Sequence, residues 1–77
     1  MTRSHDVHVT AGLDRAAWTV TQGGRTLSNH RTQRNAVSAG TRRARRDHVD
    51  LVTHGRNGRI RSKESYGNER TNRDTEN

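Results

Sequence analysis

Alternating apolar and polar residues predict short strands near the start of the chain. Val7 and Val9 alternate with polar neighbours, and Trp18 and Val20 repeat the same period of two. That period is typical of a half-buried strand. A turn is expected between the two segments at residues 12–14, where glycine and aspartate occur.

Gly23 and Gly24 predict that the next two strands form a hairpin. Both glycines tolerate a positive φ, which a two-residue hairpin turn requires. Closing the hairpin at this pair places Val20 opposite Leu27. The other face of the hairpin then collects side chains that are polar but carry little charge: Thr19, Thr21, Thr26, Ser28 and His30.

A helix is predicted from Thr32 to about Asp47. The Thr32 hydroxyl can accept a hydrogen bond from the first-turn amides. At 100° per residue, the expected core-facing side carries Val37, Gly40, Thr41 and Ala44. A glycine inside a helix costs about 1 kcal/mol, so Gly40 indicates a close contact, with Trp18 as the candidate neighbour.

Asn57 and Gly58 give the clearest local signal, because Asn-Gly favours a two-residue type I′ hairpin turn. Closing the hairpin there places Arg56 opposite Arg59, and this pairing of like charges is destabilising unless an anion binds. One face of the hairpin is expected to join the core through Val49, Leu51, Ile60 and Tyr66. The other face is expected to carry His54, Arg56, Arg59, Arg61 and Lys63 around Val52 and Asp50.

Together these elements predict an α+β fold. It has three short antiparallel strands, one amphipathic helix and a two-stranded β-hairpin, in the order β-β-β-α-β-β, with the helix packed on one face of the sheet. We expect a single small domain over residues 7–67. Residues 1–6 and 68–77 are polar and lack periodicity, so disordered ends are expected.

Composition limits how this fold can be stabilised. Hydrophobic residues make up 25% of the 77-residue chain, and phenylalanine is absent. Because the core is thin, a homodimer or a stable complex is an attractive source of extra stability. The absence of cysteine excludes disulfides and cysteine-based zinc sites. No apolar run is long enough for a signal sequence or a membrane span, so we expect a cytoplasmic protein with no membrane partner.

Several of these motifs occur together in one known family. They are W-x-V at residues 18–20, H-G-R-N-G-R-I at residues 54–60 and S-Y-G at residues 65–67, with a capped helix between the first two. This combination resembles the prokaryotic and phage family called domain of unknown function 2188, and the resemblance covers roughly residues 7–69. Because that family has no assigned activity, the resemblance implies an architecture rather than a function.

Positive charge is the main chemical feature of the sequence. Fifteen Lys and Arg against eight Asp and Glu give a formal net charge of +7, and Lys63 is the single lysine. Guanidinium groups suit bidentate contacts with phosphate, although a GC-rich genome would produce the same preference for arginine. The predicted nucleic-acid-binding residues are Arg42, Arg43, Arg45, Arg46, Arg56, Arg59, Arg61 and Lys63.

The residues indicate no other chemistry. The five histidines lack zinc-site spacing, and the serines and acids form no nucleophile motif. We therefore expect no enzyme, no metal and no cofactor. Trp18 and Tyr66 could stack on bases, but both are assigned to the core because so few other large apolar residues are available.

The leading functional hypothesis is a small nucleic-acid-binding protein that neutralises backbone phosphates. Duplex DNA is the first choice of partner and structured RNA the second, because arginine-rich small proteins suit both. By analogy with DNA-binding domains that read bases with a sheet, the polar face of the first hairpin could touch base edges. The alternatives are a phage or accessory module that binds an acidic host protein, and a domain of an assembly in which the charge serves solubility.

Overall fold

Five strands and one helix form the part of the chain that the computed structural model describes, residues 5–12 and 17–67. In chain order they are β1 (Val7–Ala11), β2 (Trp18–Gln22), β3 (Arg25–His30), α1 (Gln33–Asp47), β4 (Asp50–His54) and β5 (Ile60–Ser65). The predicted α+β fold and its order of elements are confirmed. Of the residues predicted to be disordered, 5 and 6 are described, whereas 1–4 and 68–77 lie outside the described residues. Most of the predicted turn after β1 also lies outside them.

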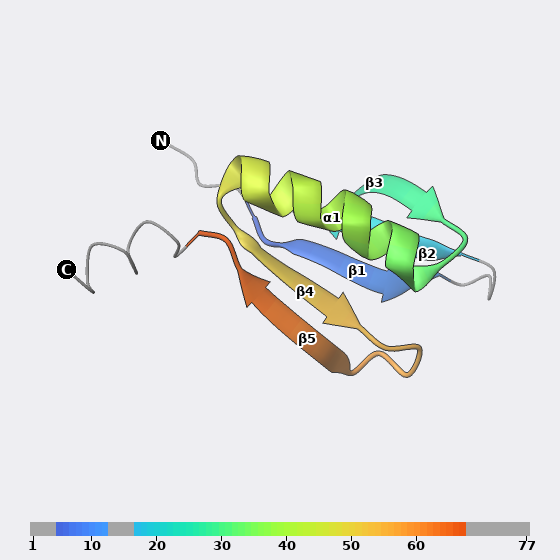
Figure 1. Cartoon of the computed structure of the whole chain (residues 1–77). Coiled ribbons are helices and arrows are strands. Elements are labelled where there is room, and N and C mark those ends of the chain that lie inside the picture. The colour runs from blue at the N-terminus through green and yellow to red at the C-terminus, as the bar shows by residue number, and fades with distance from the viewer. Residues whose placement is uncertain (1–4, 13–16, 68–77) are drawn as a thin grey trace.

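The strands form one sheet in the order β3-β2-β1-β4-β5 (Figure 1). The central strand β1 is antiparallel to β2 and parallel to β4, with Val7 beside Leu51. Parallel neighbours such as β1 and β4 cannot be joined by a tight turn. The chain reaches β4 from β3 by a crossover through α1. The helix lies over one face of the sheet and packs against β1, β2, β3 and β4.

Both ends of α1 are capped as its sequence requires. The Thr32 hydroxyl accepts a hydrogen bond from the Asn35 N–H at 3.0 Å, which confirms the predicted start. At the other end His48 adopts a left-handed conformation with φ 57°, and the Val49 N–H donates to the Ala44 carbonyl at 3.0 Å. These bonds satisfy backbone groups that a helix end leaves without partners.

The core lies between α1 and the sheet. Its fully buried side chains come mainly from the three central strands, and α1 contributes Ala36, Gly40 and Ala44. The predicted core side of the helix was therefore slightly misplaced, because Ala36 is buried whereas Val37 is only partly buried. A Cβ atom at Gly40 would lie 2.9 Å from Leu51 Cδ1. The close contact predicted at Gly40 is confirmed, but its neighbour is Leu51 rather than Trp18.

The first hairpin turns at the predicted glycines, whose φ values are 60° and 79°, but its register differs from the prediction. Val20 pairs with Ser28, and a β-bulge leaves Leu27 as the extra residue. Paired residues lie on the same face of a sheet. Ser28 therefore faces α1 with Val20, and His30 faces α1 with its partner Trp18. The prediction that Ser28 and His30 belong to the opposite polar face was wrong.

The second hairpin has a longer turn than predicted. The Gly58 N–H donates to the Gly55 carbonyl at 3.0 Å, and the Gly55 N–H donates to the Arg59 carbonyl at 2.8 Å. Gly58 has φ 86°, whereas Asn57 has no positive φ. This geometry is a type I turn followed by a glycine bulge rather than a type I′ turn. As a result Arg59 lies opposite Gly55, and the predicted pairing of two arginines does not occur.

The longer turn also changes which residue of β5 faces which side. Thr53 pairs with Ser62 as predicted, but Ile60 pairs with His54. Ile60 is 63% exposed, so its predicted place in the core was wrong. Trp18 is buried and Tyr66 packs against the core, in agreement with the prediction. Among the described residues, no helix has the length and apolar character needed to cross a membrane.

Candidate nucleic-acid interface

The outer side of α1 carries four exposed arginines, which we call the outer arginine row: Arg34, Arg42, Arg45 and Arg46. They lie away from the buried side of the helix, because side chains three to four residues apart share a face. Arg34 was not among the predicted residues, since it stands apart from the dense run that ends at Arg46. Its position in the first turn of a predicted helix was the available signal.

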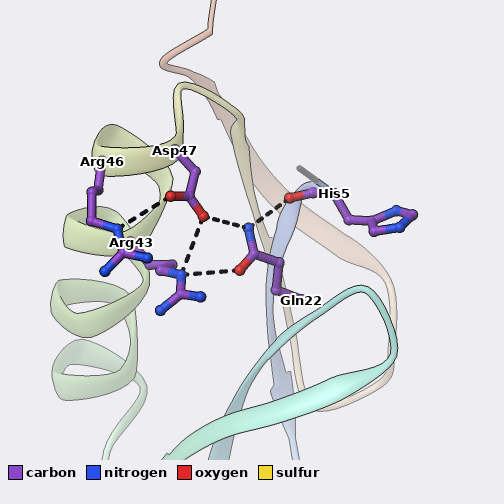
Figure 2. Close-up of polar contacts among 5 residues, drawn as sticks. All are labelled: His5, Gln22, Arg43, Arg46 and Asp47. Atoms are coloured by element: carbon purple, nitrogen blue, oxygen red, sulfur yellow. Dashed lines mark hydrogen bonds and ion pairs between the residues drawn. The ribbon is translucent and has the colours of Figure 1, made fainter. Parts of the chain in front are cut away.

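Arg43, the remaining predicted arginine of the helix, is hydrogen-bonded to other residues of the protein. Arg43 Nε donates to Gln22 Oε1 at 3.0 Å and to Asp47 Oδ2 at 3.2 Å (Figure 2). Gln22 Nε2 donates to the same Asp47 oxygen at 2.9 Å, and Arg46 Nε lies 3.3 Å from Asp47 Oδ1. This network joins the end of α1 to β2, so Arg43 is less available to a partner than Arg42.

The same contacts set the ionisation of Asp47. The hydrogen bond from Gln22 lowers the pKa of Asp47 below its usual 3.8, burial acts in the opposite direction, and Arg46 and Arg43 lower it further. Hydrogen bonds to a carboxylate favour its charged form. The negative charge of Asp47 is therefore used within the molecule.

Arg45 lies at the edge of the outer arginine row that is nearest to Tyr66. The Tyr66 hydroxyl donates to Glu64 Oε1 at 2.7 Å. This hydrogen bond is the main cause that raises the pKa of Tyr66 above 10.0, while Arg45 acts weakly in the opposite direction. The outer arginine row therefore extends from Arg45, on the side of the helix nearest Tyr66, to Arg46, beside Asp47.

Side-chain contacts attach the second hairpin to the start of α1. The Arg61 guanidinium donates to Gln33 Oε1, and Gln33 Nε2 donates to the His54 carbonyl at 3.1 Å. Arg59, in the turn of the same hairpin, is exposed. The hairpin arginines and Arg34 therefore lie at the same end of the molecule.

Of the other two predicted hairpin residues, Arg56 lines one surface hollow with Arg59 and Arg61, whereas Lys63 lies apart. The Arg56 guanidinium carbon is 5.1 Å from the centre of the Trp18 ring, a cation–π distance. Lys63 Nζ is 3.6 Å from Asp50 Oδ2, and Lys63 pairs with Val52 on the sheet face that α1 leaves uncovered. The basic face predicted for this hairpin therefore keeps Arg56, Arg59 and Arg61 together but loses Lys63 to the uncovered face of the sheet.

All the carboxylates in the described part of the chain contact other groups of the protein. Asp6 Oδ1 accepts a hydrogen bond from the Asp50 N–H at 3.1 Å, and Asp47, Asp50 and Glu64 have the partners given above. By contrast, the side chains of Arg34, Arg42 and Arg59 make no hydrogen bond or ion pair to a described residue. Within the described residues, Asp47 and Asp50 pair with cationic side chains, whereas these three arginines have no such partner.

The uncovered face of the sheet is polar and has little free charge. His8 Nδ1 lies 3.0 Å from His54 Nε2, and Thr19 Oγ1 donates to Asn29 Oδ1 at 2.9 Å. Within residues 5–12 and 17–67, no three metal-ligating side chains come together. The helix-bearing side, which carries the outer arginine row, is therefore the side best suited to contact a chain of phosphates.

Comparison with known proteins identifies a family but no function. A family model described as an uncharacterized protein conserved in bacteria matches residues 7–66, which includes all five strands and the helix. No curated protein and no solved structure matches the chain. The resemblance found in the sequence motifs is confirmed at the level of the family.

Proposed function

The chain belongs to DUF2188, a family of uncharacterized proteins conserved in bacteria, and we propose that it binds nucleic acid through the helix-bearing side of the molecule. The observation that carries this proposal is the placement of charge. The outer arginine row is exposed, whereas every described carboxylate has a partner within the protein. Such a surface attracts a polyanion and repels other cations.

The length of the outer arginine row fits a duplex. Arg34 and Arg46 are separated by twelve residues of helix, which corresponds to about 18 Å. Over about 18 Å, duplex DNA presents roughly ten phosphate charges. Several guanidinium groups along one side of the helix can therefore contact phosphates at the same time, and Arg59 adds another at the end of the row.

The charge distribution favours contacts with the backbone over readout of bases by the sheet. The uncovered sheet face presents mainly threonine and histidine side chains, and Thr19 is already bonded to Asn29. Ser28 and His30, two of the residues predicted to touch base edges, face α1 instead. We therefore propose a binding protein without catalytic activity that holds phosphates, with duplex DNA as the first partner to test and structured RNA as the second.

The test is a titration of labelled duplex DNA, single-stranded DNA and structured RNA, with an acidic protein as the control ligand. Wild type is expected to bind nucleic acid at micromolar concentration or below, and replacing the four residues of the outer arginine row by Gln should weaken binding to every sequence alike. The matched pair is Arg42→Gln and Lys63→Gln, because each removes one positive charge, the first from the helix-bearing side and the second from the uncovered sheet face. Equal binding to the acidic protein would contradict the proposal and favour a protein partner.

A further inference from the structure

A groove of about 280 Å³ lies between α1 and the edge strand β3. Its apolar floor is made by Val20, Leu27 and Ala39, and Ser28 adds a hydroxyl group. Its rim carries three guanidinium groups, those of Arg42, Arg43 and Arg46. An apolar floor beside a cationic rim suits a ligand that combines a flat apolar body with negative charge.

The β-bulge in β3 builds this floor. In a regular strand, consecutive side chains point to opposite faces, so Leu27 and Ser28 could not both face the helix. The bulge at Leu27 turns both side chains toward the groove, and it leaves Leu27 37% exposed. Bulges commonly redirect side chains at functional sites.

The rim arginines differ in how free they are. Arg43 is fixed by Gln22 and Asp47 at the bottom of the rim. Arg46 contacts Asp47 only through Nε, and its side chain is 69% exposed. The Arg42 side chain makes no hydrogen bond to a described residue. Arg42 and Arg46 can therefore reach a ligand above the groove, while Arg43 keeps that part of the rim in place.

We propose that this groove binds a nucleotide that lies outside the helical stack, with its base on the apolar floor and its phosphates at Arg42 and Arg46. This inference rests on the proposed function and names the feature of the nucleic acid that the protein prefers. Bases outside a stack commonly bind to apolar or guanidinium surfaces. The Ser28 hydroxyl is hydrogen-bonded to His30 Nε2 at 2.8 Å, and its remaining bonding capacity faces the groove.

The same bulge disfavours an added peptide strand as the occupant. A peptide that docks beside an edge strand pairs with its backbone, and a bulge interrupts the regular edge that this pairing needs. The rim charge would also attract an acidic peptide, so such a peptide belongs in the test as a competing ligand.

The test compares two DNA hairpins that differ by one unpaired 2-aminopurine nucleotide. Wild type is expected to bind the hairpin with the unpaired nucleotide roughly tenfold more tightly, as expected for one stacked base, and to protect the 2-aminopurine from a soluble quencher. Ala39→Leu fills the groove and should abolish both effects while keeping the affinity for the paired hairpin. Ser65→Leu adds a leucine side chain at an exposed position on the uncovered sheet face and should keep the preference.

A second variant guards against loss of folding. If Ala39→Leu does not melt cooperatively, Leu27→Ala removes part of the floor and should reduce the preference. Equal affinity of wild type for the two hairpins would overturn the inference while leaving the proposed function intact. Absence of salt-dependent binding to either hairpin would refute the proposed function itself. Groove-dependent binding of an acidic peptide, without a preference for the unpaired nucleotide, would assign the groove to a protein partner and overturn the inference.

Discussion

Whether Gly40→Ala raises or lowers the free energy of unfolding depends on how closely α1 packs against the sheet at Gly40. At an exposed helix position, replacing Gly by Ala stabilises a protein by about 1 kcal/mol. At Gly40, however, the added Cβ would lie 2.9 Å from Leu51 Cδ1 and 3.3 Å from Val9 Cγ2. Both neighbours are buried, with exposures of 1% and 0%, so neither can move into solvent.

Overpacking of this kind typically costs about 1–3 kcal/mol, which equals or exceeds the gain in helix propensity. We therefore expect Gly40→Ala to lower the free energy of unfolding by about 1 kcal/mol. In a domain of this size that corresponds to a fall in Tm of roughly 4–8 °C. Thermal and urea denaturation, followed by circular dichroism, measure both quantities.

The exposed position 38 supplies the control. Ser38→Ala should exceed Ser38→Gly in stability by about 1 kcal/mol, because the same propensity difference acts there without a neighbour in the way. If Gly40→Ala instead raised Tm by as much as the difference between the two Ser38 variants, α1 would not approach Leu51 as closely as described, and the packing argument would be refuted.

Three further predictions concern ionisation and the second hairpin. The pKa of Asp47 is lowered in the folded state, so the contribution of Asp47 to stability is present above the unfolded pKa and is lost as the pH falls through the folded pKa. The difference in unfolding free energy between wild type and Asp47→Asn should therefore shrink in acid. A constant difference would argue against the network of Asp47 with Gln22 and Arg43. Tyr66 is the single tyrosine, and its pKa, followed by tyrosinate absorbance, should lie above 10.0 and fall in Glu64→Gln; an unchanged value would exclude Glu64 as the cause. Gly58→Ala should cost about 1–2 kcal/mol because Gly58 has a left-handed backbone, whereas Asn57→Ala should cost less, and equal costs would favour the type I′ turn.

Local sequence signals predicted the elements well, and their ends too. Thr32 as the helix cap depends on chain neighbours alone, and so does the turn at Gly23 and Gly24. The order of strands in the sheet cannot be predicted from chain neighbours, because the parallel pairing of β1 with β4 joins segments far apart in the chain. Hairpin patterns indicate only which consecutive strands pair.

The register of the two hairpins and the availability of the arginines depend on contacts between residues far apart in the chain, which a pattern of hydrophobic and polar residues does not show. The bulge at Leu27 could not be predicted from alternation, since it places two consecutive residues against α1. Asn57 and Gly58 suit two kinds of turn, and the structure adopts the longer one. The arginine run of α1 was recognised in the sequence. However, Arg43 is hydrogen-bonded to Gln22, and the sequence pattern does not show that this residue of β2 lies beside the helix.

The dependence of nucleic-acid affinity on salt concentration tests the central proposal most directly. Each phosphate contact contributes about 0.9 to the slope of log affinity against log salt. Replacing Arg34, Arg42, Arg45 and Arg46 by Gln should therefore reduce the slope for duplex DNA by about 3–4. Of the single variants, Arg42→Gln should reduce it by about 0.9, while Lys63→Gln should leave it nearly unchanged. Equal slopes for wild type and the fourfold variant would contradict the assignment of the helix-bearing side as the phosphate-binding surface.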